Sequence, residues 1–133
     1  ESSEAAAALA ADVARSSGGS VRLLKVYPVP EQRMGAFGRV IAYADQEMAR
    51  LTAEGRDYLE TVEARLGPIS AEQTVRFGEP EEEILTEAEA FDADLIVATT
   101  ARPTGWLSRF GRGGIGERLL RDSPVPVVLV RPA

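Results

Sequence analysis

The sequence of 133 residues contains no cysteine and no histidine. Without cysteine, the chain has no disulfide, no thiolate nucleophile and no cysteine-ligated metal site. Without histidine, it lacks the Ser-His-Asp arrangement, the usual general base near neutral pH and the commonest transition-metal ligand. No arrangement of paired carboxylates replaces them, so we assign no catalytic residue.

Long apolar runs and an excess of positive charge are also missing. No window approaches the roughly 20 consecutive apolar residues of a membrane span. The Ala-rich start lacks the basic flank and long apolar centre of a signal peptide. The net charge of -6, from 15 basic and 21 acidic side chains, argues against general affinity for nucleic acids or anionic membranes. We expect a cytoplasmic protein that does not bind membranes.

What the chain does contain is an alternation of helix and strand patterns. Its length and 44% hydrophobic content suit one compact domain, residues 1–133. Helical patterns precede short apolar strand patterns four times, and a segment without clean periodicity reads as a mobile loop. The helices are expected at about 4–15, 41–66, 79–91 and 115–123, the strands at about 20–29, 69–78, 92–100 and 124–132, and the loop at 30–39. Continuous apolar strands predict an α/β fold with a parallel sheet covered by helices on both faces.

Two stretches make the chain resemble the universal stress protein family. They are DADLIV at 92–97 and ERLLRDSPVPVVLVR at 117–131, and the resemblance extends over essentially the whole chain. It implies a doubly wound, Rossmann-like sheet of five parallel strands in the order 3-2-1-4-5. It also implies a homodimer, and pairing of the apolar C-terminal strand with its twin would cover an exposed sheet edge.

The same resemblance implies a strand ahead of the first helix. Family members begin with a strand that ends in an Asp-x-Ser turn. Counting back from Leu9 places the serine at Ser2 and the aspartate just before Glu1. We therefore expect the first and central strand upstream of Glu1, because without it backbone groups on two neighbouring strands lack partners. In an alternative register, Glu1, Ser2 and Ser3 form the turn, with Glu in place of Asp.

A loop rich in glycine and arginine follows the strand pattern at 92–100. Residues 99–121 read TTARPTGWLSRFGRGGIGERLLR. In nucleotide-binding family members this loop carries Gly-x2-Gly-x9-Gly-Ser/Thr at the switch point of the sheet, where glycines and a helix N-terminus approach phosphates. The aligned positions here are Thr100, Pro103, Gly113 and Gly114. The spacing is kept, but only one of the three glycines remains.

These departures leave two interpretations of the loop. Thr100 adds a branched side chain, Pro103 removes an amide donor and fixes φ at about -65°, and Gly114 lacks the hydroxyl of Ser or Thr. The glycine-rich helix start and arginines such as Arg102 still favour an anion. The loop is thus either an intact ATP site or an altered one.

The resemblance assigns a role to each expected contact with ATP, which would be bound with Mg. Val26 would meet the adenine through its backbone. Thr99 and Thr100 would line the ribose and phosphate side, with Arg102 adding charge nearby. Gly113, Gly114 and Ile115 would hold phosphates.

These features together predict a regulatory module of the stress response that binds ATP after the fourth strand. Three alternatives stay open. They are a nucleotide-independent dimeric interaction protein with a degraded site, a slow Mg-dependent ATP hydrolase, and a regulatory domain of a larger membrane transporter. The acidic run 79–83 predicts no metal site, because successive residues at a helix start point in different directions and the helix dipole favours them there.

Overall fold

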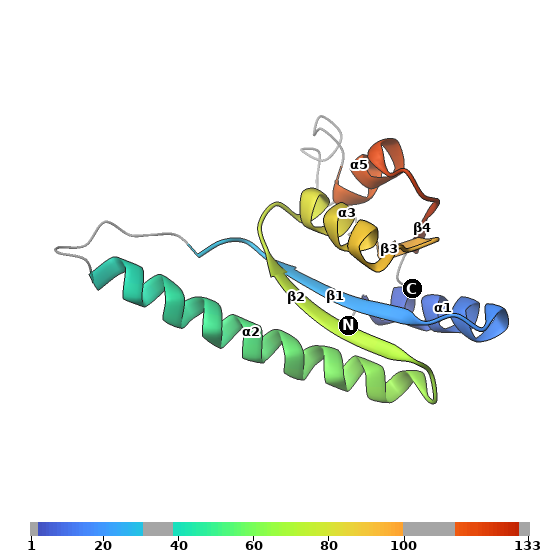
Figure 1. The fold of residues 1–133 in the computed structure, drawn as a ribbon, viewed down its shortest axis with the longest axis horizontal. Coiled ribbons are helices and arrows are strands. Elements are labelled where there is room, and N and C mark those ends of the chain that lie inside the picture. Colours follow the sequence, from blue (N-terminus) through green and yellow to red (C-terminus); the bar gives the residue numbers. More distant parts are fainter. Residues whose placement is uncertain (1–2, 31–38, 100–113, 131–133) are drawn as a thin grey trace, which may run out of the picture.

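The structure is a computed structural model that describes residues 3–30, 39–99 and 114–130. Helices and strands alternate along the chain as the sequence predicts (Figure 1). The elements are α1 (Ser3–Ser17), β1 (Val21–Tyr27), α2 (Arg39–Leu66), β2 (Ala71–Phe77), α3 (Pro80–Phe91), β3 (Ile96–Thr99), α5 (Ile115–Asp122) and β4 (Val127–Val130). The expected loop at 30–39 lies almost wholly outside these residues. Within them, no helix combines the length and apolarity that a membrane span needs.

The strands form parallel pairs rather than one continuous sheet. β1 pairs with β2, with Val21 opposite Ala71 at one end, and β3 pairs with β4, with Ile96 opposite Val127. The described strands thus make two two-stranded sheets, β1-β2 and β3-β4. These neighbours match the 3-2 and 4-5 parts of the expected order. The α/β class and the parallel pairing are confirmed, whereas a single five-stranded sheet is not seen among the described residues.

A core of small and branched apolar side chains holds α1 and α2 against the β1-β2 sheet. α1 contributes alanines and α2 contributes a stripe at three- and four-residue spacing, the pattern of a helix that buries one face. Both pack against two β1 side chains that point to the same side of the sheet. The buried members are Ala7, Ala11, Ala14, Val21, Leu23, Leu59, Val62 and Leu66.

Backbone geometry shortens the third predicted strand. The pattern at 92–100 predicts a strand from Asp92, but β3 begins at Ile96. Asp92 instead closes α3 in the left-handed conformation, with φ 55°, and its N–H points to the carbonyls of Ala88 and Glu89. Because a left-handed residue ends a helix, the first residues of the apolar stretch serve as a cap and a turn.

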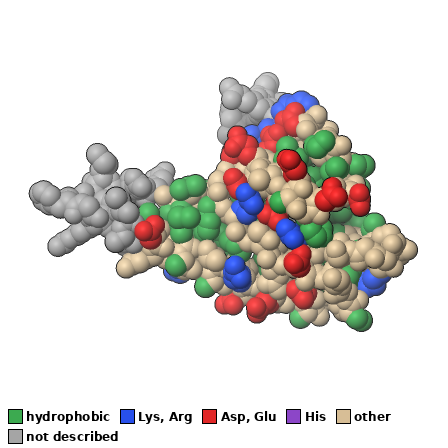
Figure 2. Space-filling view, in the orientation of Figure 1, with side chains coloured by type: hydrophobic (Ala, Val, Ile, Leu, Met, Phe, Trp, Pro, Cys, Tyr) green, Lys and Arg blue, Asp and Glu red, His purple; other side chains and the backbone are tan. Residues whose placement is uncertain are grey.

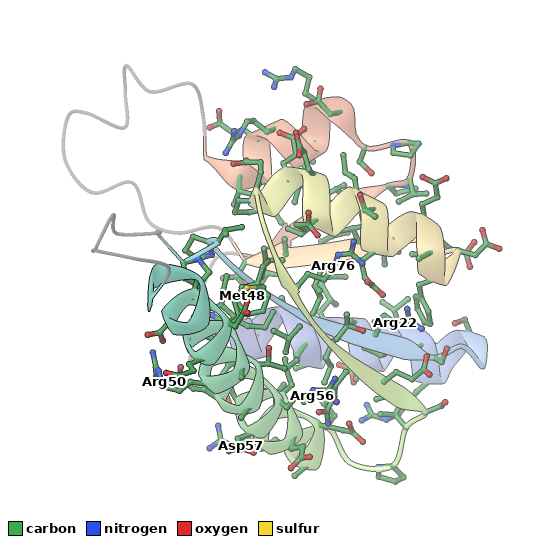
Figure 3. The ribbon with its side chains drawn as sticks, turned by 60° about the vertical axis from the view of Figure 1, so that its left-hand side comes forward. Arg22, Met48, Arg50, Arg56, Asp57 and Arg76 are labelled. Atoms are coloured by element: carbon green, nitrogen blue, oxygen red, sulfur yellow. The ribbon has the colours of Figure 1, made fainter. Side chains whose placement is uncertain are left out.

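The other face of the β1-β2 sheet carries charges that link it to α3. Arg76 on β2 donates to Glu83 at 2.7 Å and to Glu87 at 2.9 Å. Arg22 on β1 also contacts Glu87, and it donates to Glu72 at 2.7 Å. Basic and acidic side chains accordingly alternate on this face in Figure 2, and Figure 3 labels Arg22 and Arg76 on their two strands. The network ties two strands and one helix together.

Candidate functional site at the carboxyl edge of the strands

The carboxyl ends of the strands and the starts of two helices lie at one edge of the fold. β2 leads through α3 into β3, and a strand-helix-strand connection of this kind joins strands that run in the same direction. α5 leads into β4, which is parallel to β3, so the N-terminus of α5 lies at the same edge as the end of β3. In open α/β sheets this is the edge at which ligands bind.

The first turn of α5 presents backbone amides without a side-chain cap. Gly114 is the N-cap residue, with φ -71° and ψ 178°, and as a glycine it has no side chain to cap the amides of this turn. A Cβ at Gly114 would have no described atom within 4 Å. Free amides and the helix dipole favour an anion at such a helix start. The start of α5 therefore has the charge that attracts an anion, and no described atom occupies the side-chain position of Gly114.

The middle of helix α5 is buried against the rest of the fold. Leu119 has no exposed surface, and the Arg118 N–H donates to the Gly114 carbonyl at 3.2 Å. Helix α5 also packs against α3 and β4. Its uncapped N-terminus is thus held by a rigid element, which fixes where its amides point.

Four of the seven residues predicted to contact a nucleotide lie among the described residues. Val26 is the penultimate residue of β1, and Thr99 is the last residue of β3; both are half-buried. Gly114 caps α5 and Ile115 begins it. Thr100, Arg102 and Gly113 lie outside the described residues. The roles of all seven in binding stay predictions.

A groove of about 660 Å³ separates β1 from β3. Residues of α1, α2 and α3 also line it, and at one end it reaches Thr99. Most of the lining residues are apolar, among them Leu24, Ile84 and Val97. The groove thus lies between the two sheets, next to the edge that carries the predicted site.

Backbone hydrogen bonds show which edge of β1 pairs with β2 and which edge faces the groove. The Val21 N–H donates to Ser70, and the Tyr27 carbonyl accepts from Gly78, both at 2.9 Å. Successive residues of a strand direct their backbone groups to opposite edges, so the odd-numbered residues of β1 bond to β2. Leu24 and Val26 direct their N–H and C=O groups to the other edge. Among the described residues, no strand pairs with that edge.

The same reasoning applies to β3. The Ile96 N–H donates to the Pro126 carbonyl at 3.0 Å, so Ile96 and Ala98 face the β4 side. Val97 then directs its backbone groups away from β4, and in the described part of the chain no strand pairs on that side. Two free parallel edges, one on β1 and one on β3, therefore border the groove.

Acidic side chains of α3 lie close to α5, a contact that sequence spacing did not reveal. Arg118 lies 3.4 Å from Glu79 and 3.7 Å from Glu81. A hydrogen bond between the Glu81 and Asp122 carboxyl groups, together with burial, raises the pKa of Glu81 above its ordinary value. The hydrogen bonds from Arg121 and Glu81 lower the pKa of Asp122. No group of three or more acidic side chains within the described ranges is arranged to hold a metal ion.

Comparison with known proteins identifies relatives of this arrangement. Residues 1–131 match the family model described as the universal stress protein family. No curated protein matches the chain significantly. Among solved structures, a universal stress protein in complex with cAMP is 20% identical with a TM-score of 0.68, covering 100% of this chain and 90% of that one.

Two further structures have similar folds. Universal stress protein UspA from Lactobacillus plantarum is 21% identical with a TM-score of 0.67, covering 98% of this chain and 92% of that one. The universal stress protein from Archaeoglobus fulgidus in complex with dAMP is 20% identical with a TM-score of 0.57, covering 95% of this chain and 85% of that one. At these identities the likeness establishes the fold.

Proposed function

Because the chain belongs to the universal stress protein family, we propose that it is a regulatory module that binds an adenine nucleotide. The nucleotide lies at the carboxyl edge of the strands, with its phosphates at the start of α5. The uncapped N-terminus of α5 carries this proposal, since Gly114 leaves open space there. Two solved structures with this fold are complexes with cAMP and with dAMP, which makes an adenine nucleotide the first ligand to test.

In the described part of the chain, residues of β1, β3 and α5 would contact the nucleotide. The Val26 backbone at the end of β1 would meet the adenine, and Thr99 at the end of β3 would line the ribose side. Gly114 and Ile115 would offer their amides to phosphates. ATP is the proposed ligand, and any magnesium would arrive with its phosphates, because the described residues offer no metal cluster of their own.

The remaining proposed contacts come from loop residues that lie outside the described ranges. Thr100 would line the phosphate side, Arg102 would add positive charge, and Gly113 would allow the backbone to approach a phosphate. Because Thr100 and Pro103 replace glycines of the family motif, the proposal relies more on the start of α5 than on the start of the loop.

Titration calorimetry with ATP, ADP, AMP and cAMP, with and without magnesium, tests the proposal. In the Gly114→Val variant a branched side chain fills the space intended for phosphate, while φ of -71° is available to valine. We expect binding to weaken at least tenfold and the melting temperature to fall by only a few degrees, because valine is a poorer N-cap than glycine. Equal affinity in the variant and the wild type would exclude Gly114 from the site.

Phosphate release measured in the same samples separates a binding module from a slow hydrolase. Magnesium-dependent release that Gly114→Val suppresses would favour hydrolysis at this site. Binding without release would favour a regulatory module. No binding of any of the four nucleotides would leave the nucleotide-independent interaction protein as the better description.

We further propose that a fifth parallel strand occupies the groove between β1 and β3 and completes the order 3-2-1-4-5. The support is physical: two free parallel edges border an apolar groove, and unpaired backbone groups in such a place are costly. A strand seated there would end at the carboxyl edge, next to the start of α1. It would also supply the central part of the nucleotide site.

Amide hydrogen exchange in the full-length protein tests this strand with an internal control. Leu23 and Lys25 bond to β2 in any case, whereas Leu24 and Val26 are protected only by a strand in the groove. We expect all four amides to exchange slowly. Fast exchange at Leu24 and Val26 beside slow exchange at Leu23 and Lys25 would mean that the groove holds no strand.

The proposed assembly is a homodimer formed through β4. Val128 in this strand is 37% exposed, and Leu120 on the neighbouring α5 is 52% exposed. An apolar edge strand tends to pair with another strand, and a two-fold axis lets β4 pair with its own copy. The cytoplasmic location stays a prediction from the sequence.

A further inference from the structure

The first turn of α3 places negative charge beside the helix that carries the proposed phosphate site. α3 follows β2, so Glu79 and the start of this helix lie at the carboxyl edge, as the start of α5 does. The contacts of Arg118 with Glu79 and Glu81 join the two helices near this edge. Two carboxylates therefore contact Arg118, which lies one turn into the helix that carries the proposed phosphate site.

Arg118 is well placed to offset those carboxylates. It lies one turn into α5, as its backbone hydrogen bond to Gly114 shows. Arg118 contacts both Glu79 and Glu81, and its one positive charge offsets one of their two negative charges. Removing the guanidinium would leave both carboxylates uncompensated near the start of α5, and like charges repel over short distances.

The Arg118 contacts are ionic rather than tightly hydrogen-bonded. The N···O distances of 3.4 Å and 3.7 Å exceed the 2.7–3.2 Å that is typical of an N–H···O bond. The Arg118 Nε is buried, and no described group bonds to it. Arg118 therefore acts through its charge and through its position between α5 and α3. It does not form a close, hydrogen-bonded ion pair with either glutamate.

We propose that Arg118 is a positioning residue for the proposed nucleotide site: it holds the start of α5 against α3 and offsets part of the negative charge of Glu79 and Glu81 near the phosphates. This inference rests on the proposed function. It adds a residue outside the glycine-rich loop, and it explains how a chain with net charge -6 keeps an anion site next to an acidic helix start.

Nucleotide titration of matched charge variants tests the neutralising role. Arg118→Gln removes one positive charge, and so does the control Arg56→Gln at an exposed position on α2. We expect Arg118→Gln to weaken ATP binding about tenfold and Arg56→Gln less than twofold. Adding Glu79→Gln to Arg118→Gln should restore most of the loss, and Arg118→Lys should retain most of the affinity. Equal losses in the two arginine variants, or no recovery in the double variant, would overturn the inference.

Hydrogen exchange in the absence of nucleotide tests the positioning role separately. We expect Arg118→Gln to speed exchange of the Leu119 and Leu120 amides several-fold, and Arg56→Gln on α2 to leave it unchanged. If the wild type bound no nucleotide, the proposed function would fail, while faster exchange would still show that Arg118 holds α5. Unchanged exchange in Arg118→Gln would refute the positioning role whatever the nucleotide result.

Discussion

Nη1 of Arg76 on β2 lies 2.9 Å from Oε1 of Glu87 on α3. Glu87 also contacts Arg22 on β1 and is 6% exposed. One buried carboxylate thus bridges two strands that are neighbours in the sheet and links both to a helix. A buried charge of this kind is tolerated because it is paired and hydrogen-bonded.

Neutralising this carboxylate should destabilise the fold. Glu87→Gln keeps the shape of the side chain but leaves two arginines without their shared partner. We expect the free energy of unfolding to fall by about 1–3 kcal/mol, as measured by urea denaturation. Glu89→Gln, an exposed position on the same helix, is the matched control and should change it by less than about 0.5 kcal/mol. Equal effects would show that the bridge contributes no stability.

The same carboxylate makes stability depend on pH. Burial alone would raise the pKa of Glu87, but the hydrogen bonds from Arg22 and Arg76 outweigh it and lower the pKa below its ordinary value. A lowered pKa adds stability above the ordinary glutamate pKa of about 4.3, and this stability is lost as the pH falls through the folded pKa. We expect the stability difference between the wild type and Glu87→Gln to shrink in that acidic range. A difference that stays constant from neutral to acidic pH would contradict this assignment.

The anchoring of α5 can be tested at two neighbouring leucines. Leu119 is 0% exposed and Leu120 is 52% exposed. Truncating a fully buried leucine leaves a cavity, so Leu119→Ala should cost about 2–5 kcal/mol of unfolding free energy. Leu120→Ala should cost less than about 0.5 kcal/mol. Thermal and urea unfolding of the two variants give the comparison, and a similar cost at both positions would rule out the buried anchor.

The sequence predicted the elements well and their contacts poorly. Periodicity and the Pro80 helix start located α2 and α3 because those signals lie within one element. The bridge from Arg22 to Glu87 spans 65 positions, and no local pattern marks it. A hint was the charged residue Arg22 inside a largely apolar strand, which also carries Lys25.

In the candidate site, too, local signals predicted element ends, whereas contacts between elements could not be predicted. A strand followed by a glycine-rich helix start predicted the positions of Thr99 and Gly114 at element ends. The pairing of Arg118 with Glu79 depends on how α3 and α5 pack, and packing is a tertiary property. The following strand was predicted to begin too early, at Asp92, because aspartate adopts the left-handed conformation of the helix cap without the glycine that usually signals it.

The proposed dimer makes a prediction about β4. Val128→Glu places a charge on the exposed edge strand, and it should convert the dimer to a monomer in light scattering after size-exclusion chromatography. Val29→Glu is the control, because Val29 is 60% exposed and lies outside β4. A dimer that survives Val128→Glu but not Val29→Glu would place the interface elsewhere.

The most direct test of the nucleotide site is calorimetric titration of MgATP into the wild type and Gly114→Ser. Serine restores the hydroxyl of the family motif, fits the open space at this N-cap, and adds a few tenths of a kcal/mol to helix stability, which is about the difference between serine and glycine there. We predict that the wild type binds ATP in the micromolar range and that Gly114→Ser binds it several-fold more tightly. No binding by either protein at millimolar ATP would contradict a nucleotide site at the start of α5.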